Sequence, residues 1–148
     1  MKQETATVVV ERRPGDVFDW VADYRNVPRV LDGVQRWEPV GDQSEGIGAV
    51  FDVRIGVLAI GLGIRLQLTE WDRPRGIAFR SATAGITADG RWRFRPHVRG
   101  TEVSLTIAYR LPGGGLGDFV ARRIEGLMRA RVLKALDRMK AAIEERVA

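Results

Sequence analysis

The chain contains no cysteine and a single histidine, His97, and these absences exclude several kinds of site. Without cysteine the protein can form no disulfide, thiolate metal site or cysteine nucleophile. One histidine beside Pro96, in a predicted turn, offers no two-histidine metal pair and is expected to be solvated. No Gly-x-Ser-x-Gly nucleophile motif occurs, and the glycine-rich connection 112–117 lacks the Gly-Lys-Ser/Thr of a phosphate loop. The sequence therefore predicts no metal and no cofactor, and it identifies no catalytic residue.

Long apolar segments are also missing. No run approaches the roughly 18 residues of a membrane span, and residues 1–5 lack the apolar core of a signal peptide. A cytoplasmic protein is therefore the default expectation. Lysine and arginine outnumber acidic residues by 24 to 19, for a net charge of +5. This excess favours acidic partners weakly, and we interpret it mainly as a solvated, arginine-rich surface.

The remaining composition is that of an ordinary globular protein. The 148 residues are 45% hydrophobic and 29% charged, which is enough to build one hydrophobic core. We find no internal repeat, low-complexity tract or linker, so residues 1–148 are predicted to form a single domain.

The most regular pattern is a long amphipathic helix predicted for residues 116–147. No proline interrupts it, and at about 1.5 Å per residue it would be about 50 Å long. Its apolar residues form one stripe at helical spacing: Ile124, Met128, Val132, Ala135, Leu136, Met139 and Ile143. A helix of this length must lie across a large apolar surface.

Shorter elements fill the rest of the chain. Two short helices are expected at 14–24 and 26–31, with a proline in the first turn of each and Asn26 capping the second. Alternating patterns predict strands at 5–10, 34–40, 48–57, 62–69, 77–81, 91–95 and 103–110. Short connections imply antiparallel pairing, and clean alternation implies one buried face. The predicted class is α+β: a curved antiparallel sheet of about seven strands around the long helix, with two short helices after the first strand.

Several segments are similar to motifs of one known family. Residues 13–18 resemble its proline-led start of the first helix, and 23–28 its Asp-Tyr-x-Asn-x-Pro passage between short helices. Residues 46–50 resemble the Gly-x-Gly start of its third strand, and 92–94 with 100–103 resemble its last two strands and their Gly-Thr turn. In this order they resemble the START-like (SRPBCC) superfamily, which has the helix-grip fold, and its bacterial polyketide cyclase/dehydrase and lipid-transport branch. One departure is Val30, where the family often has a tryptophan.

The resemblance implies a ligand cavity between the sheet and the long helix. Side chains in the inward phase of the strands and on the helix stripe are the predicted ligand-binding residues: Phe51, Val53, Ile55, Ile64, Leu66, Phe79, Ser81, Trp92, Phe94, Tyr109, Met128 and Val132. Ligand sites are typically concave and mostly apolar, with a few polar groups. The alternative is that these side chains simply pack together, since native interiors leave few voids.

Polar side chains are scarce in the inward phase. Tyr109, Ser81 and Thr83 share it, and a buried tyrosine hydroxyl needs a partner. Glu125 and Arg131 flank the apolar stripe of the long helix, where either could reach the cavity mouth, although extension into solvent is the simpler expectation.

Two surface features suggest contacts. Arg91, Arg93 and Arg95 form a predicted basic row with Arg99 nearby. Because Trp92 and Phe94 alternate to the opposite face, no aromatic side chain is interleaved with the arginines on theirs, and we predict no nucleic-acid binding. The apolar tip 57–60 is a candidate for transient contact with a membrane surface, or for a cover over the cavity entrance.

Three functions are compatible with this sequence. The first is a non-enzymatic binder or carrier of a hydrophobic small molecule, such as a lipid, an isoprenoid quinone or a polyketide-like compound. The second is an aromatase/cyclase-type enzyme that uses the same cavity. The third is an interaction module that regulates another protein. The fold does not choose among them, and the sequence makes no prediction of oligomeric state.

Overall fold

The computed structural model describes residues 2–81, 87–110 and 118–145. Along the chain the elements are β1 (Lys2–Val10), α1 (Pro14–Ala22), the 3₁₀ turn η1 (Tyr24–Asn26), α2 (Val27–Val30), β2 (Val34–Pro39), β3 (Val50–Val57), β4 (Ile60–Asp72), β5 (Gly76–Ser81), β6 (Thr87–His97), β7 (Gly100–Arg110) and α3 (Asp118–Glu145). The predicted order of strands and helices is confirmed. Thr83 and the glycine-rich connection 112–117 lie outside the described residues.

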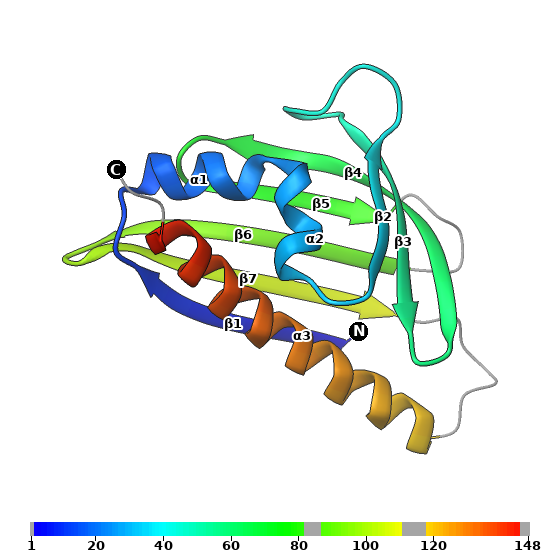
Figure 1. The fold of residues 1–148 in the computed structure, drawn as a ribbon. Coiled ribbons are helices and arrows are strands. Elements are labelled where there is room, and N and C mark those ends of the chain that lie inside the picture. Colours follow the sequence, from blue (N-terminus) through cyan, green and yellow to red (C-terminus); the bar gives the residue numbers. More distant parts are fainter. Residues whose placement is uncertain (1, 82–86, 111–117, 146–148) are drawn as a thin grey trace.

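The strands form one antiparallel sheet in the order β1-β7-β6-β5-β4-β3-β2. The sheet is a meander from β2 to β7, and β1 pairs with β7 from Lys2 opposite Tyr109 to Val10 opposite Thr101. Figure 1 shows that the sheet is curved and that α3 runs across its concave face. Helices α1 and α2 lie on the same side of the sheet. This is the helix-grip arrangement that the sequence predicts.

The two short helices begin where proline favours helical backbone. Pro14 stands at the start of α1, and Val17, Phe18 and Trp20 are its buried residues. The Asp23 side chain accepts a hydrogen bond from the Arg25 backbone N–H and so caps η1. The expected cap by Asn26 is wrong: its side-chain Nδ2 donates to the Trp20 carbonyl oxygen at 2.8 Å instead. That contact ties the start of α2 to the end of α1.

Helix α3 buries the predicted stripe, but to different depths along its length. Val132, Ala135, Leu136, Met139 and Ile143 are all buried. Polar contacts also hold this C-terminal half: Lys134 Nζ lies 3.1 Å from an Asp32 oxygen, and Lys140 Nζ donates to the Val9 carbonyl oxygen at 2.8 Å. Near the other end Ile124 is buried, whereas Met128 is only half-buried.

An aromatic cluster fills the core beneath α1. The Phe18 ring meets Trp71 edge-on with ring centres 5.4 Å apart, and Phe94 with ring centres 5.7 Å apart. Phe94 in turn stacks on Trp92 at 6.2 Å. Such pairs add about 0.5–1.5 kcal/mol beyond the area that they bury. The cluster therefore packs α1 against β4 and β6.

Two half-buried carboxylates, Asp32 and Glu144, make stability depend on pH. A hydrogen bond from Arg138, and a second from Lys134, hold the pKa of Asp32 below its ordinary 3.8. Hydrogen bonds from Lys140 and from the Glu11 backbone N–H likewise lower the pKa of Glu144 from 4.5. A carboxylate whose pKa falls on folding stabilises the protein above its unfolded pKa, and that contribution is lost as the pH drops through the folded value.

We therefore expect the melting temperature to fall as the pH is lowered below about 4.5. Glu144→Gln removes one of these carboxylates, so it should lower the melting temperature at pH 7. The difference from the wild type should shrink as the pH is lowered towards about 3, where Glu144 becomes increasingly protonated. Thermal unfolding of both proteins, monitored by circular dichroism across this pH range, measures the difference in melting temperature. A difference that does not change with pH would contradict the assignment.

Candidate functional site

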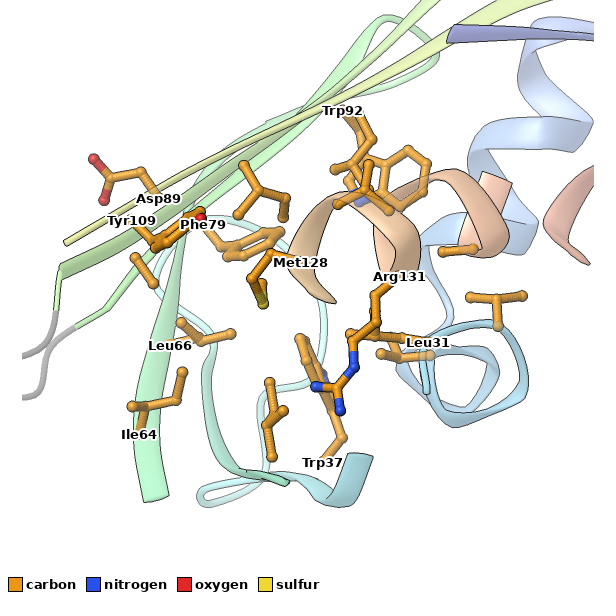
Figure 2. A pocket seen from close by; sticks show the side chains of 18 of the residues that line it. Leu31, Trp37, Ile64, Leu66, Phe79, Asp89, Trp92, Tyr109, Met128 and Arg131 are labelled. Carbon is orange, nitrogen blue, oxygen red and sulfur yellow. The ribbon is translucent and has the colours of Figure 1, made fainter. Parts of the chain in front are cut away.

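A pocket lies between the inner face of the sheet and α3, and we call it the α3 pocket. Its volume is about 180 Å³, and its walls come from β2 to β7, the short helices and α3 (Figure 2). The lining residues are Trp20, Val21, Asn26, Val27, Val30, Leu31, Trp37, Ile55, Val57, Leu62, Ile64, Leu66, Phe79, Thr87, Ala88, Asp89, Trp92, Leu105, Ile107, Tyr109, Ile124, Met128, Arg131, Val132, Ala135 and Met139. Most of this wall is aliphatic or aromatic.

Eight of the twelve residues predicted to bind a ligand line the α3 pocket: Ile55, Ile64, Leu66, Phe79, Trp92, Tyr109, Met128 and Val132. The other four do not line it: Phe51, Val53, Ser81 and Phe94. Phe51 packs against Tyr24 and Trp37, and Phe94 lies within the aromatic core. The alternation of a strand identifies its buried face, but does not distinguish packed from pocket-lining positions on that face. The ligand-binding role of all twelve stays a prediction.

Several lining residues were not singled out from the sequence. Trp20, Val30 and Leu31 come from α1 and α2 or the turn that follows, where period-two alternation does not apply. Trp37 lies on β2, whose pairing with β3 shifts register between Val34 and Arg36. That irregularity breaks the alternation that would mark Trp37 as inward. Its aromatic character within a predicted strand was the available signal.

Phe79 lies flat on the neighbouring strand because that strand has a glycine opposite it. Phe79 pairs with Gly90 between β5 and β6. A Cβ atom at Gly90 would overlap the Phe79 ring and come within 2.5 Å of its Cε1 and Cε2 atoms. Glycine at this position therefore lets the Phe79 ring, which lines the pocket, lie against the sheet.

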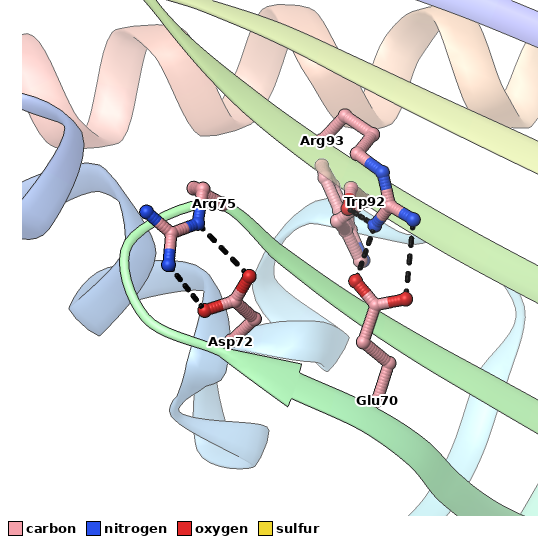
Figure 3. Close-up of polar contacts among 5 residues, drawn as sticks. All are labelled: Glu70, Asp72, Arg75, Trp92 and Arg93. Atoms are coloured by element: carbon pink, nitrogen blue, oxygen red, sulfur yellow. Dashed lines mark hydrogen bonds and ion pairs between the residues drawn. The ribbon is translucent and has the colours of Figure 1, made fainter.

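The strand segment that carries Trp92 is supported by an ion pair. Arg93 donates to both Glu70 oxygens, at 2.7 and 3.1 Å, and also to the Trp92 carbonyl oxygen at 3.1 Å (Figure 3). Arg75 makes a similar two-bond contact with Asp72 in the adjacent turn. The predicted basic row is thus partly neutralised, since Arg95 also lies 3.9 Å from Glu102.

Three polar side chains of the pocket wall have a buried atom without a hydrogen-bond partner among the described residues. These atoms are the Tyr109 hydroxyl, Arg131 Nη1 and Asp89 Oδ1. Asp89 Oδ1 nevertheless has a counter-ion, because Arg80 Nε lies 3.4 Å from it. The Tyr109 hydroxyl and Arg131 Nη1 are therefore the two atoms that a ligand in the pocket could satisfy with a hydrogen bond.

The Tyr109 hydroxyl is a hydrogen-bond donor at neutral pH. Burial raises the pKa of Tyr109, and the negative charges of Glu125 and Glu4 raise it further. The hydroxyl therefore stays protonated. The expectation that Tyr109 faces inwards is confirmed, since its side chain is buried and lines the pocket.

The Arg131 guanidinium reaches the pocket because it packs on a glycine. A Cβ atom at Gly33 would lie 2.8 Å from Arg131 Nη2 and 2.9 Å from Cζ and Nη1. Gly33 also has φ +84°, a backbone conformation that favours glycine. Figure 2 shows the Arg131 side chain directed towards Trp37, on the far side of Met128 from Tyr109. The expected extension of Arg131 into solvent is wrong.

Other polar groups near the pocket are accounted for. The Asn26 amide donates to the Trp20 carbonyl oxygen and accepts from Arg29. The Asp89 carboxylate points away from Phe79 and Met128 (Figure 2). His97 is the last residue of β6, and its Nδ1 accepts from the Arg99 backbone N–H in the turn that follows. The α3 pocket thus combines an apolar wall with two buried donors.

A second hollow lies beside α1 and η1, next to Trp71, and it is lined largely by charged groups. Arg73 donates to both oxygens of Asp19, and Arg25 does the same to Asp23. These side chains satisfy one another, so this hollow presents fewer groups to a ligand than the α3 pocket.

Comparison with solved structures shows the same fold in proteins of low sequence identity. The aromatase/cyclase ZhuI from Streptomyces sp. R1128 superposes with a TM-score of 0.84 at 17% identity, covering 99% of this chain and 96% of that one. TTHA0849 from Thermus thermophilus gives 0.82 at 21% identity, covering 96% and 97%. Ara h 8.0201 gives 0.67 at 11% identity, covering 98% and 99%.

Sequence comparison gives the family. None of the curated protein sequences compared with this chain matches it. The family described as polyketide cyclase/dehydrase and lipid transport matches residues 1–144, which is nearly the whole chain. The chain therefore belongs to the polyketide cyclase/dehydrase and lipid transport family of the START-like superfamily.

Proposed function

We propose that this protein binds a hydrophobic small molecule in the α3 pocket, as a carrier or binder rather than an enzyme. The observation that carries the proposal is an open volume walled by Trp20, Trp37, Phe79 and Trp92 together with aliphatic side chains. Protein interiors normally close such volumes, and pockets of this composition are typical of small-molecule sites. A packed core would have favoured the interaction module instead.

The volume of the pocket limits the size of ligand that it can enclose. An engineered apolar cavity of about 150 Å³ binds benzene, so about 180 Å³ accommodates a body of roughly one or two rings. A lipid, an isoprenoid quinone or a long polyketide chain would insert one end, or would require α3 to move away from the sheet.

Cyclisation catalysed in the same pocket is the second candidate, and the structural similarity to an aromatase/cyclase favours it. Tyr109 would serve as a proton donor, because burial keeps its hydroxyl protonated. No proton acceptor stands out among the described lining residues: the Asp89 carboxylate points away from the pocket, and His97, at the end of β6, does not line it. Conversion of a polyketide chain by the purified protein would decide for the enzyme.

Transient membrane contact remains part of the carrier proposal. Leu58 and Ile60, at the β3–β4 tip, are 48% and 64% exposed, whereas the neighbouring Val57 lines the pocket. An apolar tip beside a pocket would allow a ligand to pass between protein and bilayer. None of the helices in the described part of the chain combines the length and apolar character of a membrane span.

The four tryptophans provide a direct test of pocket binding. Titration of ¹⁵N-labelled protein with 2-naphthamide, a neutral two-ring probe, should shift the indole N–H signals of Trp20, Trp37 and Trp92, because their side chains line the pocket. Trp71 lines the second hollow instead, and its signal should stay in place as an internal control. Unchanged spectra, or shifts confined to Trp71, would contradict the proposed function.

A further inference from the structure

Arg131 carries a buried guanidinium nitrogen without an internal acceptor. Its Nη1 atom is fully covered and has no hydrogen-bond partner within residues 2–81, 87–110 and 118–145. A guanidinium remains protonated in proteins and carries only donors. Burying part of such a group without an acceptor is unfavourable. Arg131 Nη1 therefore needs a hydrogen-bond acceptor, and the described residues do not provide one.

The carboxylate next to Gly33 in the sequence, that of Asp32, is already engaged by other cations. Asp32 precedes Gly33, on which the Arg131 guanidinium packs. Its carboxylate is shared by Lys134 and Arg138, from the next two turns of α3, with one oxygen to each. Other arginines close to the sheet have their own acids, as Arg93 has Glu70 and Arg129 has Glu4. Arg131 thus differs from its neighbours on α3 in facing the pocket rather than a carboxylate.

The rest of the pocket wall indicates which kind of ligand could supply an acceptor for Arg131. Asp89 is the one acidic residue among the described lining residues, and its carboxylate points away from the pocket towards Arg80. The labelled pocket residues that lie around Arg131 in Figure 2, namely Leu31, Trp37 and Met128, are apolar. A ligand that matches this wall has an apolar body and one anionic oxygen group at the Arg131 end.

We propose that the α3 pocket binds a small amphipathic anion, an apolar carboxylate of about one or two rings, through Arg131. This inference rests on the proposed function and specifies its ligand class. The planar guanidinium suits a carboxylate because two parallel N–H groups meet two oxygens. Tyr109 lies on the opposite side of Met128 and could donate to a second oxygen on the ligand body.

The test compares two probes of equal size, 2-naphthoate and 2-naphthamide, by isothermal titration calorimetry at neutral pH. The wild type should bind the anion at least about tenfold more tightly than the amide, because a charge-assisted bond replaces a neutral one. Arg131→Gln should reduce that ratio to about one by weakening naphthoate binding. Arg131→Lys, which keeps the charge but not the planar fork, should give an intermediate ratio.

Arg138→Gln is the matched control, since Arg138 lies on α3 but faces Asp32 instead of the pocket. It should retain the wild-type preference. Equal binding of both probes by the wild type, or a preference that survives Arg131→Gln, would overturn the role of Arg131 and leave hydrophobic binding standing. Failure of both probes to bind would overturn the proposed function itself. Circular dichroism confirms that each variant is folded.

Discussion

Leu136→Asp is expected to leave the protein unfolded at room temperature. Leu136 is 2% exposed on α3 and packs in the main hydrophobic core. An uncompensated buried carboxylate is unfavourable by several kcal/mol, in addition to about 2–5 kcal/mol for the lost packing. A domain of this size has only about 5–15 kcal/mol of unfolding free energy in total. Circular dichroism and the dispersion of the amide proton spectrum measure the outcome.

The same change three residues earlier on the same helix is the control. Leu133 is 52% exposed, so Leu133→Asp should change the unfolding free energy by no more than about 0.5 kcal/mol. Both variants add one aspartate to α3, and they differ only in the face that carries it. A cooperatively folded Leu136→Asp protein would refute the packing of α3 on the sheet.

Gly90→Ala is expected to lower both the unfolding free energy and the affinity of the α3 pocket for its ligand. The added methyl group would overlap the Phe79 ring. The ring must then move away from β6, and we expect it to move into the α3 pocket, which it lines. Overpacking of this kind reduces the unfolding free energy by about 1–3 kcal/mol. The displaced ring should also occupy pocket volume, and so weaken binding of 2-naphthamide.

A double-mutant cycle isolates this contact. In a Phe79→Ala background the obstacle is gone, so the further change Gly90→Ala should lower the unfolding free energy much less than it does alone. Gly63→Ala is the control, because a Cβ atom at that strand position meets nothing within 4 Å. Chemical denaturation supplies the four free energies. Additive effects of Phe79→Ala and Gly90→Ala would show that the ring does not rest on Gly90.

The contrast between α3 residues shows what the sequence could predict. The helical period placed Met128 and Leu136 on one stripe, and both do face the interior. In the structure Leu136 is buried in the core, whereas Met128 is half-buried and lines the pocket. A periodic pattern reports the direction in which a side chain points, but the distance to the opposing surface depends on how far the sheet curves away.

The polar groups of the pocket were harder to predict for a related reason. Tyr109 was expected to face inwards because it shares the phase of Leu105 and Ile107 on β7. Arg131 was expected to extend into solvent, because a long charged side chain usually can. Its inward course depends on Gly33, far earlier in the chain, whose missing side chain leaves room for the guanidinium. Such an accommodation between distant segments has no local signature in the sequence.

The uneven attachment of α3 has a consequence for hydrogen exchange. Its C-terminal half combines deep burial with links from Lys134 to Asp32, from Lys140 to Val9 and from Glu144 to the Glu11 backbone N–H. Between residues 122 and 131 the described side chains are half-buried or exposed apart from Ile124. Amide protons in the first turns should therefore exchange much faster than those beyond Val132, through local openings that leave the sheet intact. Openings of that kind would admit a ligand to the pocket at a rate set by helix fraying rather than by global unfolding.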